Sequence, residues 1–148
     1  MIERESAKDR IKKKLNSYTD IVREIKQLEQ HLADLEDRIL PGGKKMDGMP
    51  RTPGAGGDLS DIVAERLDLI ERYRAKIDEL HQAQLSIERM IEGCDPLERR
   101  IMRTKYIEGH TWEEVCVIVS YCWAQVHRIH SRVLNKLAEN EEIQEKET

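Results

Sequence analysis

Aromatic residues are scarce in this sequence: they make up 4% of its 148 residues, and phenylalanine is absent. Hydrophobic residues reach 39% and charged residues 36%, whereas ordinary globular domains are about half apolar and about a quarter charged. A large core of the kind that encloses a metabolic active site is therefore not expected. High charge with few aromatics fits long helices that each bury one stripe, and we predict an all-α protein.

Long apolar runs and paired cysteines are also missing. The longest apolar run, residues 115–119, is far short of the ~20 residues of a membrane-spanning helix, and the charged N-terminus does not resemble a signal peptide. The three cysteines, Cys94, Cys116 and Cys122, show no Cys-x-x-Cys spacing. We therefore expect a cytoplasmic protein with no membrane partner, no disulfide framework and no zinc site.

Motifs of catalysis are absent as well. The sequence has no Ser-His-Asp order with nucleophile-elbow glycines, no phosphate-cradling glycine loop before a helix and no metal-ligand cluster. His127 and His130 have helical spacing but no cysteine or carboxylate companion. The sequence predicts neither an enzyme nor a bound metal or cofactor.

Glycine and proline are concentrated in one segment. Residues 41–57 hold six of the eight glycines and three of the four prolines, which predicts a flexible loop. Apolar residues repeat every seven positions before it (Ile11, Tyr18, Ile25, Leu32, Ile39) and, except at Gln84, after it (Val63, Ile70, Ile77, Ile91). This period predicts a long antiparallel helical hairpin over residues 1–93, which we expect to form a homodimer.

The remaining chain is organised differently. Gly93 suits a helix end and Asp95-Pro96 a helix start, so we predict a helix over residues 96–108 that ends at Gly109. A second helix starts with the capping motif Thr111-Trp112-Glu113-Glu114. A break at Ser120-Tyr121 and a longer helix follow, which places a compact domain at residues 95–138 and an acidic disordered tail at residues 139–148.

The two helices around that break have the spacing of a helix-turn-helix. Cys116, Ser120 and Val126 supply the small residue, the compact turn and the early apolar residue that steeply crossing helices need. Ser120 stands where glycine is usually preferred for a left-handed backbone. We expect these residues to face inward: Val115, Cys116, Val119, Val126, Ile129, Val133 and Leu137.

These residues also carry a family resemblance. Region 4 of sigma-70-type factors is similar to the segment Tyr106-Ile107-Glu108-Gly109-His110-Thr111-Trp112-Glu113-Glu114-Val115. A phage-encoded family of small sigma-region-4-like proteins, related to late-operon transcriptional regulators, resembles the continuation Tyr121-Cys122-Trp123-Ala124-Gln125-Val126-His127-Arg128-Ile129-His130. Ser120 in place of glycine and Cys122 in place of a capping serine depart from the pattern. The resemblance implies binding of double-stranded DNA, with the second helix in the major groove.

The side chains expected to face outward agree with that implication. Gln125 can pair with adenine and Arg128 with guanine, each through two hydrogen bonds. Five side chains are suited to bind phosphates: His127, Ser131, Arg132, Lys136 and Thr111. Trp123 is suited to pack against a sugar-phosphate edge or a thymine methyl group. The candidate DNA-binding residues are Thr111, Trp112, Trp123, Ala124, Gln125, His127, Arg128, Ser131, Arg132 and Lys136. Arg99, Arg100, Arg103 and Lys105 extend the same basic face.

The net charge of −4 is the sum of segments that differ in the sign of their charge. Residues 97–137 carry seven Lys or Arg against four Glu, whereas residues 138–148 carry one Lys against five Glu. A sequence-specific transcriptional regulator of phage or prophage origin is therefore our prediction. The alternatives are a small terminase-type packaging subunit and a helical interaction protein that binds RNA polymerase without reading DNA. Whether a DNA-binding form also contacts RNA polymerase stays open.

Overall fold

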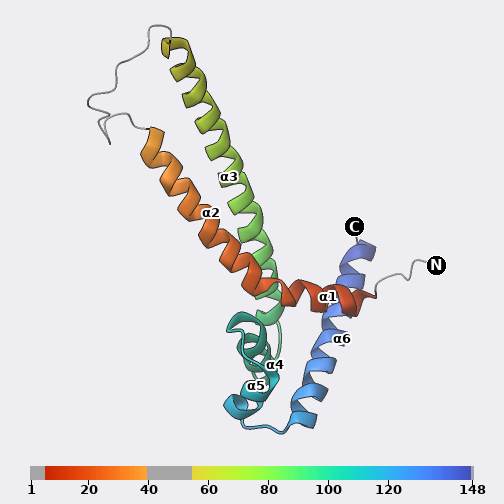
Figure 1. Cartoon of the computed structure of the whole chain (residues 1–148). Helices are drawn as coiled ribbons and strands as arrows, with labels where there is room; N and C mark the ends of the chain where they lie inside the picture. The colour runs from red at the N-terminus through yellow and green to blue at the C-terminus, as the bar shows by residue number, and fades with distance from the viewer. Residues whose placement is uncertain (1–5, 40–54, 148) are drawn as a thin grey trace, which may run out of the picture. The chain divides into compact units, whose positions relative to one another are not determined.

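The computed structural model describes residues 6–39 and 55–147, and this part of the chain consists of helices joined by short turns, with no strand (Figure 1). In chain order the elements are α1 (Ala7–Asn16), α2 (Tyr18–Ile39), α3 (Ala55–Glu92), α4 (Pro96–Met102), a π-helical turn η1 (Arg103–Ile107), α5 (Trp112–Val119) and α6 (Trp123–Glu147). The prediction of an all-α protein is confirmed. None of the helices within these residues is both long enough and apolar enough to cross a membrane.

The described residues divide into two compact units. One comprises residues 6–22 and 83–147, and the other comprises residues 23–39 and 55–82. The predicted boundary between residues 93 and 95 lies inside the first of these units. The predicted first hairpin helix is in addition divided at Ser17 into two helices, α1 and α2. The Ser17 hydroxyl donates to the carbonyl of Lys14 at 2.6 Å, which closes the last turn of α1.

In the unit of residues 23–82, α2 and α3 lie side by side (Figure 1). Three pairs hold them: Arg74 with Glu36 at 2.7 Å, the stacked rings of Tyr73 and His31, and His81 with Glu29 at 3.8 Å. Glu29, early in α2, pairs with His81, whereas Glu36, later in α2, pairs with the earlier residue Arg74 of α3, so the helices run in opposite directions. Three predicted stripe residues, Ile25, Ile70 and Ile77, are buried here, and so is Leu80.

The predicted loop over residues 41–57 lies mostly outside the described residues. Its last three positions, 55–57, are instead the first turn of α3.

The other unit packs α1 against α6. Ile11 and Leu15 of α1 are buried together with Val133, Leu134 and Leu137 of α6. Ile87 and Ile91, from the end of α3, complete this core and are fully buried. The apolar seam of α1 is therefore covered by α6, a partner that its heptad spacing did not identify.

Helix α6 also corrects the predicted acidic tail. Residues 139–147 continue the helix and are not disordered. They contain no glycine or proline that would stop it, and Glu141 forms an ion pair with Arg10 of α1 at 4.0 Å. The packing of α1 on α6 stabilises the helix past the point at which its sequence becomes acidic.

Candidate nucleic-acid interface

Helices α5 and α6 are joined by a tight turn. The Thr111 hydroxyl caps α5 by accepting from the backbone N–H of Glu114 at 3.3 Å, and Gly109 precedes it with a φ of 77°. At the other end Ser120 has φ 62° and ψ 38°, the left-handed conformation that its position predicts. The backbone N–H of Tyr121 then donates to the carbonyl of Cys116 at 3.3 Å. These contacts fix where α5 ends and where α6 begins.

A small apolar core supports the two helices from behind. Val115 and Val119 of α5 are buried with Val126 of α6 and Ile101 of α4. Cys116 and Ile129 pack partly buried against this core, and Val133 and Leu137 are buried further along α6. The seven positions predicted to face inward do so.

The N-terminal half of α6 presents an exposed polar face. Ala124, Gln125, Arg128 and Ser131 are all exposed. Gln125 is held near the start of the helix, where its side-chain oxygen accepts from the Cys122 thiol at 3.4 Å. Arg128 makes neither a hydrogen bond nor an ion pair with any residue that the structure describes. Its guanidinium and the Gln125 amide are thus available to an external ligand.

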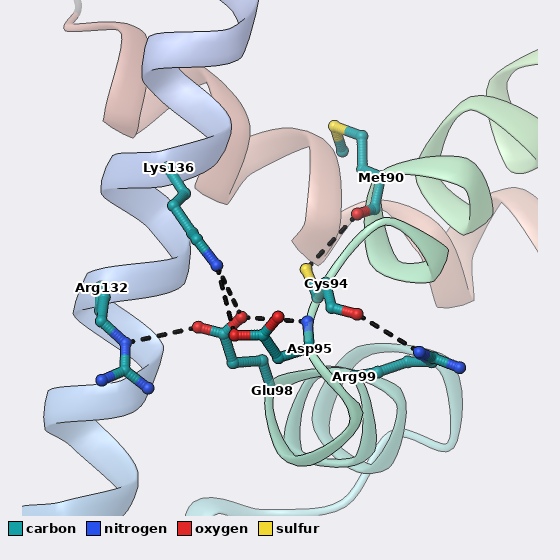
Figure 2. Close-up of polar contacts among 7 residues, drawn as sticks. All are labelled: Met90, Cys94, Asp95, Glu98, Arg99, Arg132 and Lys136. Carbon is teal, nitrogen blue, oxygen red and sulfur yellow. Dashed lines mark hydrogen bonds and ion pairs between the residues drawn. The ribbon is translucent and has the colours of Figure 1, made fainter.

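Arg132 and Lys136 have an internal partner that sequence reasoning missed. Both contact Glu98 of α4: Lys136 Nζ lies 3.0 Å from one carboxylate oxygen, and Arg132 Nε lies 3.4 Å from the other (Figure 2). The backbone N–H of Asp95 donates to the same carboxylate at 3.1 Å. Glu98 is only 1% exposed. The two cations predicted to bind phosphate therefore neutralise a buried charge within the protein.

The protonation of this cluster follows from its contacts. Burial by itself raises the pKa of Glu98, but hydrogen bonds from Lys136 and from the backbone of Asp95 outweigh it and hold the pKa below its usual value. The hydrogen bond to Glu98 correspondingly raises the pKa of Lys136. All three side chains are charged at neutral pH, so the cluster ties α4 to α6 by ion pairs.

His127 and both tryptophans belong to a ring cluster. The His127 ring centroid lies 4.7 Å from that of Trp112 and 4.2 Å from that of Trp123. Among the described groups, none hydrogen-bonds to the buried Nε2 of His127. Trp112 is half-buried, whereas Trp123 is 51% exposed at the start of α6. Of the three, Trp123 is the one that an external ligand can reach most freely.

His130 closes the buried side of this ring cluster. Its Nε2 lies 2.6 Å from the Tyr106 hydroxyl, and its ring lies 4.6 Å from that of Trp112. Burial is the main cause that lowers the pKa of His130 to about 4, and the nearby charges of Lys12, His127, Lys8 and Lys105 lower it further. Burial also raises the pKa of Tyr106 to about 12. Both groups are therefore neutral at neutral pH and share a hydrogen bond.

The four basic residues before α5 act mainly within the fold. Arg99 and Arg103 both form ion pairs with Glu92. Arg100 donates to the carbonyl of Ile118 at 3.0 Å. Lys105 donates to the carbonyl of His110 at 3.3 Å and its ammonium lies 5.1 Å from the Trp112 ring centroid. Because these four side chains bind groups of the protein itself, they contribute less to the basic face than four unpaired cations would.

Comparisons with protein-family models, with curated proteins and with solved structures find no match to this chain.

Proposed function

We propose that the chain is a sequence-specific DNA-binding transcriptional regulator of phage or prophage origin. In this proposal α5, the turn at Ser120 and α6 act as a helix-turn-helix, and the N-terminal half of α6 enters the major groove. The resemblance to region 4 of sigma-70-type factors favours this function over others that an all-α chain can serve.

One observation carries the proposal: Arg128 is exposed, has no partner among residues 6–39 and 55–147, and lies next to an exposed Gln125 on a helix whose opposite side is packed. Guanidinium and amide groups are the side chains that read guanine and adenine through paired hydrogen bonds. A packed helix presents them without the entropic cost of ordering a loop. Exposed Thr111 and Ser131 supply hydroxyls to phosphates on either side.

Selection of bound sequences from random duplex DNA tests the proposal, followed by binding measurements with Arg128→Ala. We expect the wild type to enrich a defined sequence, and the variant to bind it about 5- to 150-fold more weakly, equivalent to about 1–3 kcal/mol, with relaxed preference at one base pair. Arg89→Ala is the matched control, because Arg89 is another exposed arginine of the same unit. Failure to enrich any sequence would refute the proposal.

We further propose a homodimer formed through α2 and α3. Ile62 and Leu69 are exposed on α3 and lie seven residues apart, so they share one face of the helix. A second copy would cover them. Sedimentation of the full chain distinguishes this dimer from the ring-sized assembly that a small terminase-type subunit would form.

Contact with another protein is the second candidate function. Val117 is 79% exposed on the outer face of α5, and Ile118 beside it is exposed as well. Apolar side chains that protrude together suit a protein partner. RNA polymerase is the partner that the sigma-like resemblance suggests. Co-purification with polymerase that is lost in Val117→Ser while DNA binding is kept would support this second role.

A further inference from the structure

A series of ring contacts links buried residues to the exposed start of α6. It begins at Tyr106 and His130 and passes through Trp112, whose ring centroid lies 4.6 Å from that of His130. It continues to His127 at 4.7 Å and ends at Trp123, a further 4.2 Å away. Exposure increases along the series, from buried Tyr106 and His130 to Trp123, which is 51% exposed. The indole of Trp123 is therefore supported from behind by other rings.

His127 supports Trp123 along one side of α6. The two residues are four positions apart, so their side chains lie one turn apart on the same side of the helix. Their rings are tilted by 43° at a centroid distance of 4.2 Å. The Nε2 atom of His127 is buried and hydrogen-bonds to no group within residues 6–39 and 55–147. The imidazole is therefore better placed to hold the indole than to bind the phosphate that the sequence assigns to it.

Trp123 differs in chemistry from the exposed polar side chains that follow it. In the proposed complex α6 enters the major groove, and the N-terminal residues of a recognition helix are the ones that reach base edges. Gln125 and Arg128 offer hydrogen bonds there, whereas Trp123 offers a large apolar ring with a single donor. The apolar group that bases present in the major groove is the C5-methyl of thymine. An exposed indole at the start of α6 is complementary to that methyl group.

We propose that Trp123 reads a thymine through its C5-methyl group and that His127 is the positioning residue that holds the indole against it. This inference rests on the proposed function and adds one base to those that Gln125 and Arg128 would contact. Packing against His127 restricts the indole before DNA binds, so less side-chain freedom is lost in the complex.

Deoxyuridine isolates the methyl group, because it differs from thymidine only by the absence of that group. In the sequence that the wild type selects, each thymine is replaced in turn by uracil. The full-length wild type, Trp123→Ala and Ile143→Ala are then titrated with each duplex. Ile143→Ala is the matched control, since it removes an exposed apolar side chain from the far end of the same helix.

We expect one thymine whose replacement weakens wild-type binding about fourfold, equivalent to about 0.8 kcal/mol for one buried apolar carbon. Ile143→Ala should show the same loss at that position, and Trp123→Ala should show none. An enriched sequence in which no thymine behaves in this way overturns the methyl contact and leaves the proposed function intact. Failure of the wild type to enrich any sequence overturns both.

Two substitutions of His127 separate positioning from phosphate binding. His127→Phe keeps a ring beside Trp123 but can neither hydrogen-bond nor carry a charge, whereas His127→Gln can hydrogen-bond but has no ring. We expect His127→Phe to retain both the methyl effect and the wild-type salt dependence, and His127→Gln to lose the methyl effect. A shallower salt dependence in His127→Phe, or an unchanged methyl effect in His127→Gln, overturns the positioning role.

NMR of the wild type tests the same contact without any substitution, so it also decides the matter if a His127 variant does not fold. Cross-peaks between the indole protons of Trp123 and the imidazole protons of His127 should be present in the free protein and persist in the complex with the selected duplex. Their absence from the free protein, or their loss on binding, overturns the positioning role.

Discussion

Acidification should destabilise the unit that contains His130. This side chain is only 7% exposed and its pKa is lowered to about 4 in the folded protein, against about 6.5 in an unfolded chain. Between these two values the unfolded chain binds the proton and the folded protein does not. The free energy of unfolding is therefore highest above about pH 6.5 and falls as the pH drops toward about 4.

The size of the effect follows from the difference in pKa. A difference of about 2.5 units, at about 1.4 kcal/mol per unit, gives a total loss of about 3 kcal/mol. About 2 kcal/mol of it falls between about pH 7 and about pH 5. The contribution of Glu98, whose pKa is lowered in the folded protein, begins to be lost only near the pKa of an unfolded glutamate, about 4.3, which lies below the interval from about pH 7 to about pH 5.

Tryptophan fluorescence during urea unfolding is the assay, since both tryptophans belong to this unit and the ring of Trp112 lies 4.6 Å from that of His130. The control is His130→Gln, which keeps a polar neighbour for the Tyr106 hydroxyl but does not titrate. We expect the wild type to lose about 2 kcal/mol more than this variant on going from about pH 7 to about pH 5. Equal losses in the two proteins would refute the argument, because some other group would then cause the pH dependence.

Two further predictions concern stability. Leu15→Ala, which removes a fully buried side chain of α1, should lower the free energy of unfolding by about 3 kcal/mol in the same fluorescence assay. The control is Leu67→Ala, at an exposed position. A loss below about 1 kcal/mol for Leu15→Ala would contradict the packing of α1 in this unit. Ser120→Gly should raise the free energy of unfolding by about 0.5–1 kcal/mol, because glycine adopts the left-handed φ of 62° without strain. Ser120→Ala, which does not relieve the strain, should give no such gain, and equal effects of the two substitutions would argue against a left-handed turn.

Local signals in the sequence predicted local structure well. The Thr111 cap, the break at Ser120 and the end at Gly109 all lie where their residues place them. The buried positions of α5 and α6 were also predicted, because a helix with a period of 3.6 residues places Val115, Val119 and Val126 on packed faces. These features depend on neighbours within one or two turns, which a sequence displays directly.

Partners between distant segments could not be predicted in the same way. The apolar spacing of Ile11 and Leu15 shows that α1 needs a partner, but α6 and a hairpin partner satisfy that spacing equally. The contacts of Glu98 were not predicted for a similar reason. In the sequence, a glutamate at this position is explained by its favourable interaction with the N-terminus of a helix. Only the crossing of α4 with α6 brings it to Lys136 and Arg132.

The contact with Glu98 distinguishes two basic residues of α6, because Arg132 can leave the carboxylate to bind a phosphate and Lys136 cannot. A buried carboxylate that loses its cations is costly, so at least one of them must stay when DNA binds. Lys136 is the tighter partner at 3.0 Å and also lies 3.6 Å from Asp95. Arg132 contacts Glu98 at 3.4 Å and its side chain is 62% exposed, so it can turn toward a phosphate while Lys136 and the Asp95 backbone still satisfy the carboxylate. In the proposed complex Arg132 therefore joins Arg128 and Ser131 at the duplex, and Lys136 keeps α6 aligned on α4.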